Sequence, residues 1–149
     1  MRTPERVKWD FVRQWLDKAR KDLAAGAVLL KEEFEDYDNV GFHAQQAAEK
    51  FIKAFLVRHQ IEFPKSHDIA LLRQLVARVD SRLAEKLAIA DALTPYGVEF
   101  RYPGDLPAVS QEDGEKALRL AQQTRDLIME SLKSYLDAGR PGGGEPGKK

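Results

Sequence analysis

The stretch Gly41-Phe42-His43-Ala44-Gln45-Gln46-Ala47-Ala48-Glu49-Lys50-Phe51-Ile52-Lys53-Ala54-Phe55-Leu56 decides the fold. With successive residues turned by about 100°, its alanines and most of its large apolar side chains fall on one wide arc of a helix. Such a helix is stable when that arc is buried against other helices. The pattern predicts a helix from about Val40 to about Gln60, which ends before Pro64.

The segment before this stretch is predicted to form a long first helix. Thr3 suits the N-cap, Pro4 suits the first helical position, and Glu5 adds an acid to the first turn. Apolar residues then recur at helical spacing over about six turns. They are Val12, Trp15, Leu16, Ala19, Leu23, Ala27, Leu30 and Phe34.

Two further helices are predicted after Pro64. Ser66 is placed to cap a third helix. Asp80-Ser81 can re-cap the chain for a shorter fourth helix, which reaches Thr94-Pro95. The segment from Tyr96 to Val109 contains two glycines and two prolines, so it is predicted to be an ordered loop rather than a helix.

A last helix completes the predicted fold. Ser110-Gln111-Glu112-Asp113 resembles a capping box with Asp in place of the usual Glu or Gln, and helical periodicity follows to Leu136. The periodicity predicts an all-α domain over residues 1–138, an antiparallel up-and-down bundle of four to five helices. The Gly- and Pro-rich tail, residues 139–149, has no apolar side chain to bury and is predicted to be disordered.

Composition excludes several classes of protein. The 149 residues suffice for one domain, and 24 Lys and Arg balance 24 Asp and Glu, so no global positive field predicts nucleic-acid or membrane binding. The absence of cysteine excludes disulfides and thiolate chemistry. No signal peptide and no membrane-spanning apolar run is recognisable, which predicts a cytoplasmic protein with no membrane partner.

A polar stripe lies beside the apolar arc of the predicted second helix. His43, Gln46, Lys50 and Lys53 share this face, which spans roughly a quarter of the helix circumference. An imidazole, an amide and two ammonium groups could hold a phosphate or a nucleotide. The alternative is that Lys50 and Lys53 are solvated surface residues, with His43 and Gln46 at the edge of the core.

Two other polar positions are candidate ligand contacts. His67 and Asp68 stand at a predicted helix start, where free backbone N–H groups favour an anion. The alternative is that His67 caps or packs locally while Asp68 satisfies the first turn. Arg101 could bind phosphate in a bidentate manner, or pair with a nearby acid and pin its loop. The spacing of the three histidines predicts no metal site.

Some apolar residues lie outside the predicted core stripes. Leu56 and Val57 fall among the polar positions of the second helix, and Trp9 and Phe11 add apolar surface near the start of the first. Because apolar surface of this kind is often covered by a partner, a homodimer is predicted.

Three parts of the sequence resemble the HEPN family of small helical domains, which is named for a proposed nucleotide-binding role. They are the stretch His43 to Lys50 with Lys53-Ala54, the segment Pro64 to Asp68, and Arg101-Tyr102-Pro103. The resemblance covers roughly residues 9 to 136. It implies a bundle of four or five helices that commonly dimerises. It also implies a frequent gene neighbour, a minimal nucleotidyltransferase, with which such proteins can form toxin–antitoxin-like pairs.

Many HEPN proteins are ribonucleases that use an arginine and a histidine separated by four to six intervening residues. No arginine stands at that distance before His43, His59 or His67, so this motif is absent. Lys53 and His59 could substitute, but an ammonium group poorly replaces the guanidinium fork of arginine. A metal-independent ribonuclease is therefore the least favoured hypothesis, and RNA is not an expected partner.

The leading hypothesis is a non-catalytic HEPN module that binds a nucleotide or another phosphate-bearing ligand and partners a minimal nucleotidyltransferase. The alternative is a pure dimerisation or protein-interaction module without a ligand. No catalytic residue, metal ligand or cofactor is predicted. The candidate ligand contacts are His43, Gln46, Lys50, Lys53, His67 and Arg101.

Overall fold

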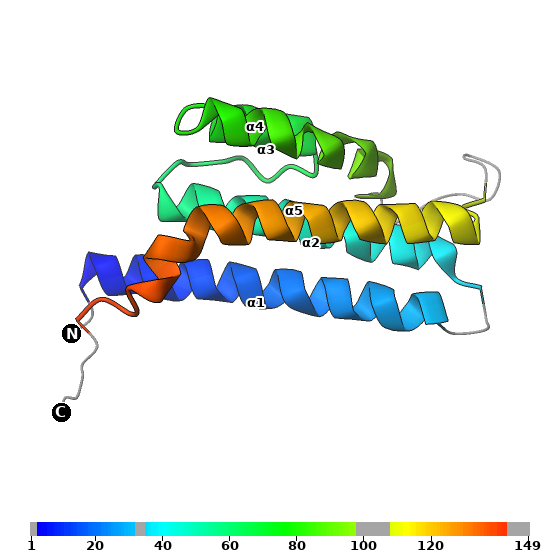
Figure 1. Cartoon of the computed structure of the whole chain (residues 1–149), viewed down its shortest axis with the longest axis horizontal. Coiled ribbons are helices and arrows are strands. Elements are labelled where there is room, and N and C mark those ends of the chain that lie inside the picture. Colours follow the sequence, from blue (N-terminus) through cyan, green and yellow to red (C-terminus); the bar gives the residue numbers. More distant parts are fainter. Residues whose placement is uncertain (1–2, 32–34, 98–107, 143–149) are drawn as a thin grey trace.

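The computed structural model describes residues 3–31, 35–97 and 108–142. Every regular element in these ranges is a helix, which confirms the predicted all-α fold (Figure 1). Phe34, placed in the first helix by the sequence pattern, lies outside the described residues. The elements are α1 (Pro4–Lys31), α2 (Tyr37–Arg58), α3 (Ile69–Val76), α4 (Ser81–Lys86), the 3₁₀ helix η1 (Leu87–Gly97) and α5 (Gln111–Asp137).

Helix α2 is the centre of the bundle. It runs antiparallel to α1, and it also packs against α5, η1 and α3 (Figure 1). Helices α3 and α4 with η1 lie on the side of α2 and α5 that faces away from α1. A residue on α2 can therefore meet side chains from every layer of the molecule.

Small residues allow the helices to approach α2 closely. Its alanines at positions 44, 47, 48 and 54 are completely buried, as is Phe51 between them. A side chain at Gly41 would place its Cβ 2.6 Å from Cδ1 of Tyr96 in η1. Glycine at position 41 thus leaves the space that the Tyr96 ring occupies.

Two predicted helix starts differ from the structure. Helix α2 begins at Tyr37, because the side chain of Asp36 caps it and accepts a hydrogen bond from the Asn39 N–H. The prediction that Ser66 caps α3 is wrong. Asp68 is the N-cap, and Ser66 Oγ instead accepts a hydrogen bond from the Asp68 N–H at 3.0 Å.

Two other predicted caps are confirmed. Asp80 caps α4 through a hydrogen bond from the Leu83 N–H. Ser110 and Asp113 form a reciprocal capping box at the start of α5, with Asp113 in the position that Glu or Gln usually holds.

The predicted fourth helix divides into α4 and the 3₁₀ helix η1. The buried residues Leu87, Ala90 and Leu93 are three positions apart, and a 3₁₀ helix with three residues per turn places them on one face. Pro95 lies inside η1, which extends to Gly97, so the prediction of a loop from Tyr96 is wrong for its first two residues. Residues 98–107 of that predicted loop lie outside the described residues.

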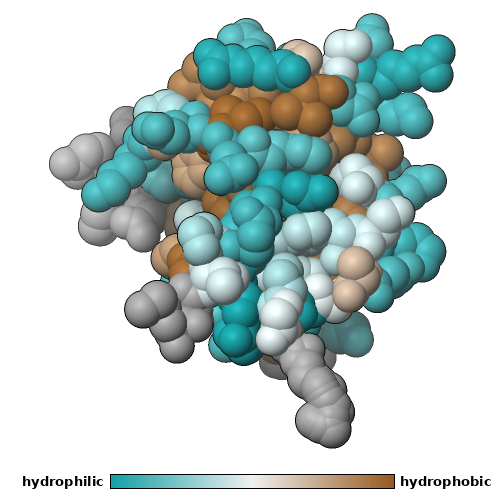
Figure 2. Space-filling model, turned by 90° about the vertical axis from the view of Figure 1, so that its left-hand side faces the viewer, coloured by the Kyte–Doolittle hydropathy of each residue, from teal (hydrophilic) through white to brown (hydrophobic). Residues whose placement is uncertain are grey.

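Two of the four apolar residues that suggested a homodimer, Leu56 and Trp9, are buried within the chain. Leu56 is completely buried, and the ring of Trp9 packs against Tyr135 with centroids 5.2 Å apart. Phe11 remains 50% exposed beside an open groove of about 710 Å³. Figure 2 faces the end where α1 begins and α2 ends, and apolar side chains reach the surface there between hydrophilic ones.

The chain beyond α5 returns to the start of α1. Arg140 donates two hydrogen bonds to the Asp10 carboxylate, both at 3.0 Å. Residues 143–149 lie outside the described part, so disorder of the tail stays a prediction. Among the helices that the structure describes, none combines the length and apolar character required to cross a bilayer.

Candidate functional site

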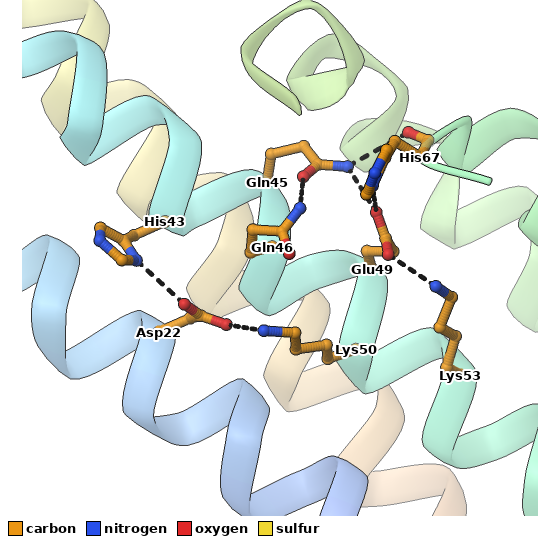
Figure 3. A network of polar contacts seen from close by, with 8 residues as sticks. All are labelled: Asp22, His43, Gln45, Gln46, Glu49, Lys50, Lys53 and His67. Carbon is orange, nitrogen blue, oxygen red and sulfur yellow. Dashed lines mark hydrogen bonds and ion pairs between the residues drawn. The ribbon is translucent and has the colours of Figure 1, made fainter. Parts of the chain in front are cut away.

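The polar stripe of α2 is organised around two carboxylates, and Figure 3 shows both groups. The first, which we call the Asp22 cluster, joins Asp22 of α1 to His43 and Lys50 of α2. Asp22 Oδ1 lies 2.9 Å from His43 Nδ1, and Asp22 Oδ2 accepts a hydrogen bond from Lys50 Nζ at 2.5 Å. One carboxylate of α1 thereby holds two of the predicted ligand contacts.

The second group, the Glu49 cluster, consists of Glu49, Gln45, Lys53 and His67. Glu49 Oε2 accepts a hydrogen bond from Lys53 Nζ at 2.7 Å. Glu49 Oε1 accepts one from Gln45 Nε2 and lies near His67 Nδ1, both at 2.9 Å. Gln45 Nε2 also donates to the backbone oxygen of His67 at 3.2 Å, so the ring and the backbone of this residue are both held.

Gln46 extends the Glu49 cluster. Its Nε2 donates to Gln45 Oε1 at 2.7 Å (Figure 3). Gln45 is completely buried and packs against Gly97, where an added Cβ would lie 2.9 Å from the amide carbon of Gln45. The end of η1 therefore helps to hold the Gln45 amide in the orientation that forms hydrogen bonds with both Gln46 and Glu49.

Lys53 is buried, which corrects the alternative that it is a solvated surface residue. Only 7% of the residue is exposed, and its ammonium lies 5.4 Å from the ring centroids of both Trp15 and Phe63. An aromatic face attracts a cation, and the Glu49 carboxylate compensates its charge. Position on a polar helix face did not imply exposure, because residues outside α2 cover this part of it.

Hydrogen bonds determine the charge state of Glu49. Burial alone would raise the pKa of this carboxyl, but hydrogen bonds from Lys53, Gln45 and His67, together with the charge of Lys53, bring the pKa below its ordinary value of 4.5. Glu49 is therefore an ionised, buried acceptor in the folded protein at neutral pH.

The lowered pKa of Glu49 predicts a defined loss of stability in acid. Because the folded-state pKa lies below the unfolded value of 4.5, the stabilising contribution is complete above that pH and disappears as the pH falls through the folded-state pKa. Urea denaturation between about pH 6 and pH 3 should show a steeper fall for the wild type than for Glu49→Gln. Parallel curves for the two proteins would contradict the assignment.

The structure gathers five of the six predicted contacts but gives them partners that the sequence analysis missed. His43 and Lys50 share Asp22, whereas Lys53 and His67 share Glu49. Arg101 lies outside the described residues. The missed residues are Asp22, Gln45 and Glu49, of which Glu49 carried a signal because it stands four residues from both Gln45 and Lys53.

Two predictions remain, one for the start of α3 and one for His59. Asp68 satisfies the first turn of α3 by accepting from the Leu71 N–H at 3.4 Å, as the alternative had it, whereas His67 contacts Glu49 of α2 instead of capping or packing locally. His59 packs on the Phe55 ring with centroids 4.4 Å apart, and burial followed by the charges of Arg58 and Lys8 lowers its pKa. Its surroundings differ from those of Lys53, so no contact supports the Lys53–His59 pair considered for RNA cleavage.

The site is electrically balanced and partly open. Two carboxylates face two ammonium groups, and the described residues contain no group of three or more His, Asp or Glu that could hold a metal ion. The side chain of His67 is 65% exposed, and those of His43 and Lys50 are 27% and 21% exposed. A ligand could therefore reach His67, His43 and Lys50, while Glu49 and Lys53 lie beneath the surface.

The chain matches the model of one protein family, described as the HEPN domain, over residues 12–132. Among curated proteins it is 26% identical over 137 residues to Putative toxin MJ1304 of Methanocaldococcus jannaschii, a match that covers 83% of this chain and 89% of that protein.

Two crystal structures resemble most of the chain. TT1696 from Thermus thermophilus superposes with a TM-score of 0.62 and 32% identity, covering 81% of this chain and 98% of the other. ST0689, described as an archaeal HEPN homologue, has the same TM-score of 0.62 with 20% identity. The match covers 81% of this chain and 97% of the ST0689 chain. The second match shows a shared fold.

Proposed function

This chain belongs to the HEPN family, and from that premise we propose that it is a non-catalytic HEPN module that binds a nucleotide or another phosphate-bearing ligand. It acts beside a minimal nucleotidyltransferase, in a toxin–antitoxin-like pair. The similarity to Putative toxin MJ1304 supports the toxin-like assignment. Absence of an arginine before any histidine at the ribonuclease spacing supports the non-catalytic role.

The Asp22 cluster is the observation that carries the ligand proposal. It presents the Lys50 ammonium at the surface beside His43, where phosphate oxygens could accept hydrogen bonds from Lys50. Asp22 already neutralises Lys50, so an incoming phosphate competes with this carboxylate. Phosphate affinity is therefore expected to depend on Asp22 as well as on Lys50.

Because phosphate and Asp22 compete for Lys50, substitutions of Lys50 and of Asp22 are expected to change nucleotide affinity in opposite directions. Lys50→Ala is expected to weaken ATP or GTP binding about tenfold, since a charge-assisted hydrogen bond is lost. Asp22→Asn is expected to tighten binding, because the ammonium loses its competing anion while the side-chain volume is kept. Isothermal titration calorimetry measures both effects.

Lys133→Ala provides the matched control. Lys133 is also paired with an aspartate, Asp137, at 2.6 Å, but on the exposed surface of α5. Its replacement should leave nucleotide affinity unchanged. If neither ATP nor GTP binds the isolated protein or its complex with the nucleotidyltransferase, the nucleotide part of the proposal is wrong.

A pure interaction module is the second candidate, and the groove beside Phe11 favours it. The groove lies between the start of α1 and the segment after α2, and apolar side chains line most of it. They are Val7, Phe11, Val57, Ile61 and Phe63. Co-purification decides between the candidates: a partner that is retained by Lys50→Ala but lost by Phe11→Ala, without any nucleotide effect, supports the interaction module.

A further inference from the structure

The two ring nitrogens of His67 have different surroundings. Nδ1 lies 2.9 Å from Glu49 Oε1, and Nε2 has no hydrogen-bond partner among the described residues. Glu49 also accepts from Lys53 Nζ and from Gln45 Nε2. A carboxylate that faces an ammonium group and an amide N–H is ionised and can only accept, so the hydrogen between Glu49 and His67 belongs to Nδ1.

The orientation of the Gln45 amide agrees with this assignment. Its Oε1 accepts from Gln46 Nε2 at 2.7 Å, which directs its Nε2 towards Glu49. Both hydrogens of the Gln45 amide are then accounted for, one donated to Glu49 and the other to the backbone oxygen of His67. The neutral His67 ring consequently carries its proton on Nδ1 and a lone pair on Nε2.

The exposed atom is thus a fixed hydrogen-bond acceptor. Two contacts hold His67, one from Glu49 to its ring and one from Gln45 to its backbone oxygen at 3.2 Å. With 65% of the side chain exposed, Nε2 can be reached from solvent. A phosphate group above its second pKa of about 6 offers acceptors only, so it does not complement this atom, whereas a hydroxyl or amino group does.

We infer that His67 binds the nucleoside part of the ligand by accepting a hydrogen bond at Nε2 from a sugar hydroxyl or a base amino group, with Glu49 as the residue that positions it. This inference rests on the proposed function and assigns the phosphate to the Asp22 cluster. Glu49 and Lys50 are consecutive residues of α2, so the two clusters lie next to each other along this helix (Figure 3). His67 therefore distinguishes nucleotides from phosphates that carry no nucleoside, whereas Lys50 binds the negative charge of the phosphate.

The position of the proton can be measured without any ligand. In ¹⁵N-labelled protein at about pH 8, above the ordinary histidine pKa of about 6.5, long-range ¹⁵N–¹H correlation spectra distinguish the two tautomers. The expected result for His67 is a protonated Nδ1 and an unprotonated Nε2, with the signal assigned by its loss in His67→Ala. A proton on Nε2 would overturn the inference.

Calorimetry with separate parts of the ligand tests the recognition itself. Adenosine, guanosine, ATP, GTP and inorganic tripolyphosphate are titrated into the wild type and into His67→Ala at about pH 8. For those nucleosides and nucleotides that bind the wild type, His67→Ala is expected to weaken binding about tenfold. The affinity for tripolyphosphate should not change. An equal loss for tripolyphosphate and nucleotides would refute the assigned role.

Two substitutions at the same position sharpen the contrast. His67→Gln supplies an amide oxygen that can accept, whereas His67→Lys supplies only donors. Nucleoside affinity should decrease in the order wild type, His67→Gln, His67→Lys, and equal affinities for the two variants would overturn the inference. If no probe binds the wild type, the proposed function and this inference both fail. If nucleotides bind but His67 has its proton on Nε2, only the inference fails.

Discussion

Replacement of Glu49 by alanine is expected to lower the free energy of unfolding by about 3–5 kcal/mol, because it leaves the buried Lys53 ammonium without its counter-charge. Lys53 is 7% exposed, and Glu49 is the carboxylate that pairs with its ammonium. Folded domains are stable by only about 5–15 kcal/mol, so this single change is a large fraction of the total. Urea denaturation followed by circular dichroism measures the difference.

The exposed pair on α5 provides the control for this prediction. Lys133 and Asp137 have the same spacing of four residues and a similar distance of 2.6 Å, but both side chains are mostly exposed. Asp137→Ala should leave stability nearly unchanged, because solvent screens an exposed pair. A Glu49→Ala variant as stable as Asp137→Ala would show that the buried pair does not contribute.

A double variant separates loss of the pair from loss of one partner. Replacing Glu49 with leucine and Lys53 with methionine removes both charges and keeps similar volumes. Such exchanges of a buried ion pair are often neutral or stabilising. We therefore expect the double variant to be markedly more stable than Glu49→Ala, while the hydrogen bond that orients His67 is lost.

Replacement of Phe51 by alanine is expected to lower the free energy of unfolding by a similar amount, about 3–5 kcal/mol. Phe51 is completely buried in α2, the helix that packs against α1, α5, η1 and α3. Removing its ring costs the transfer free energy of the phenyl group and leaves a cavity that close-packed neighbours fill only in part. Thermal and urea denaturation should both report the loss.

Phe11→Ala removes the same group from a different environment. Because Phe11 is 50% exposed, its removal should cost at most about 1 kcal/mol, and no internal cavity is formed. The pair of variants therefore separates core packing from the groove at the surface. Equal losses at the two positions would mean that Phe11 is part of the core in solution.

Local sequence patterns predicted most of the fold. The apolar arc of α2, the capping box at Ser110 and the Asp80 cap all depend on residues a few positions apart, which fix helix periodicity and helix ends. The same patterns failed where two local solutions compete. Ser66 and Asp68 are both good caps, and the spacing of Leu87, Ala90 and Leu93 fits an α-helix almost as well as a 3₁₀ helix.

The candidate site was predicted only in part. Its cationic and imidazole groups were found on one face of α2, because they follow from helical spacing within a single stretch. Asp22 could not be found in this way, since it lies 21 residues before His43 and reaches it only across the contact of α1 with α2. Arg101 stays a prediction, because it lies outside the described residues.

The sequence by itself determined that this protein is a helical bundle, that α2 has an apolar arc, and that His43, Gln46, Lys50 and Lys53 share its polar side. Only the tertiary structure decided what those polar groups do. Trp15 and Phe63 cover Lys53, and Glu49 and Asp22 compensate the two ammonium charges. The physical reason is that periodicity depends on neighbours along one helix, whereas burial and charge pairing depend on residues that other elements bring to it.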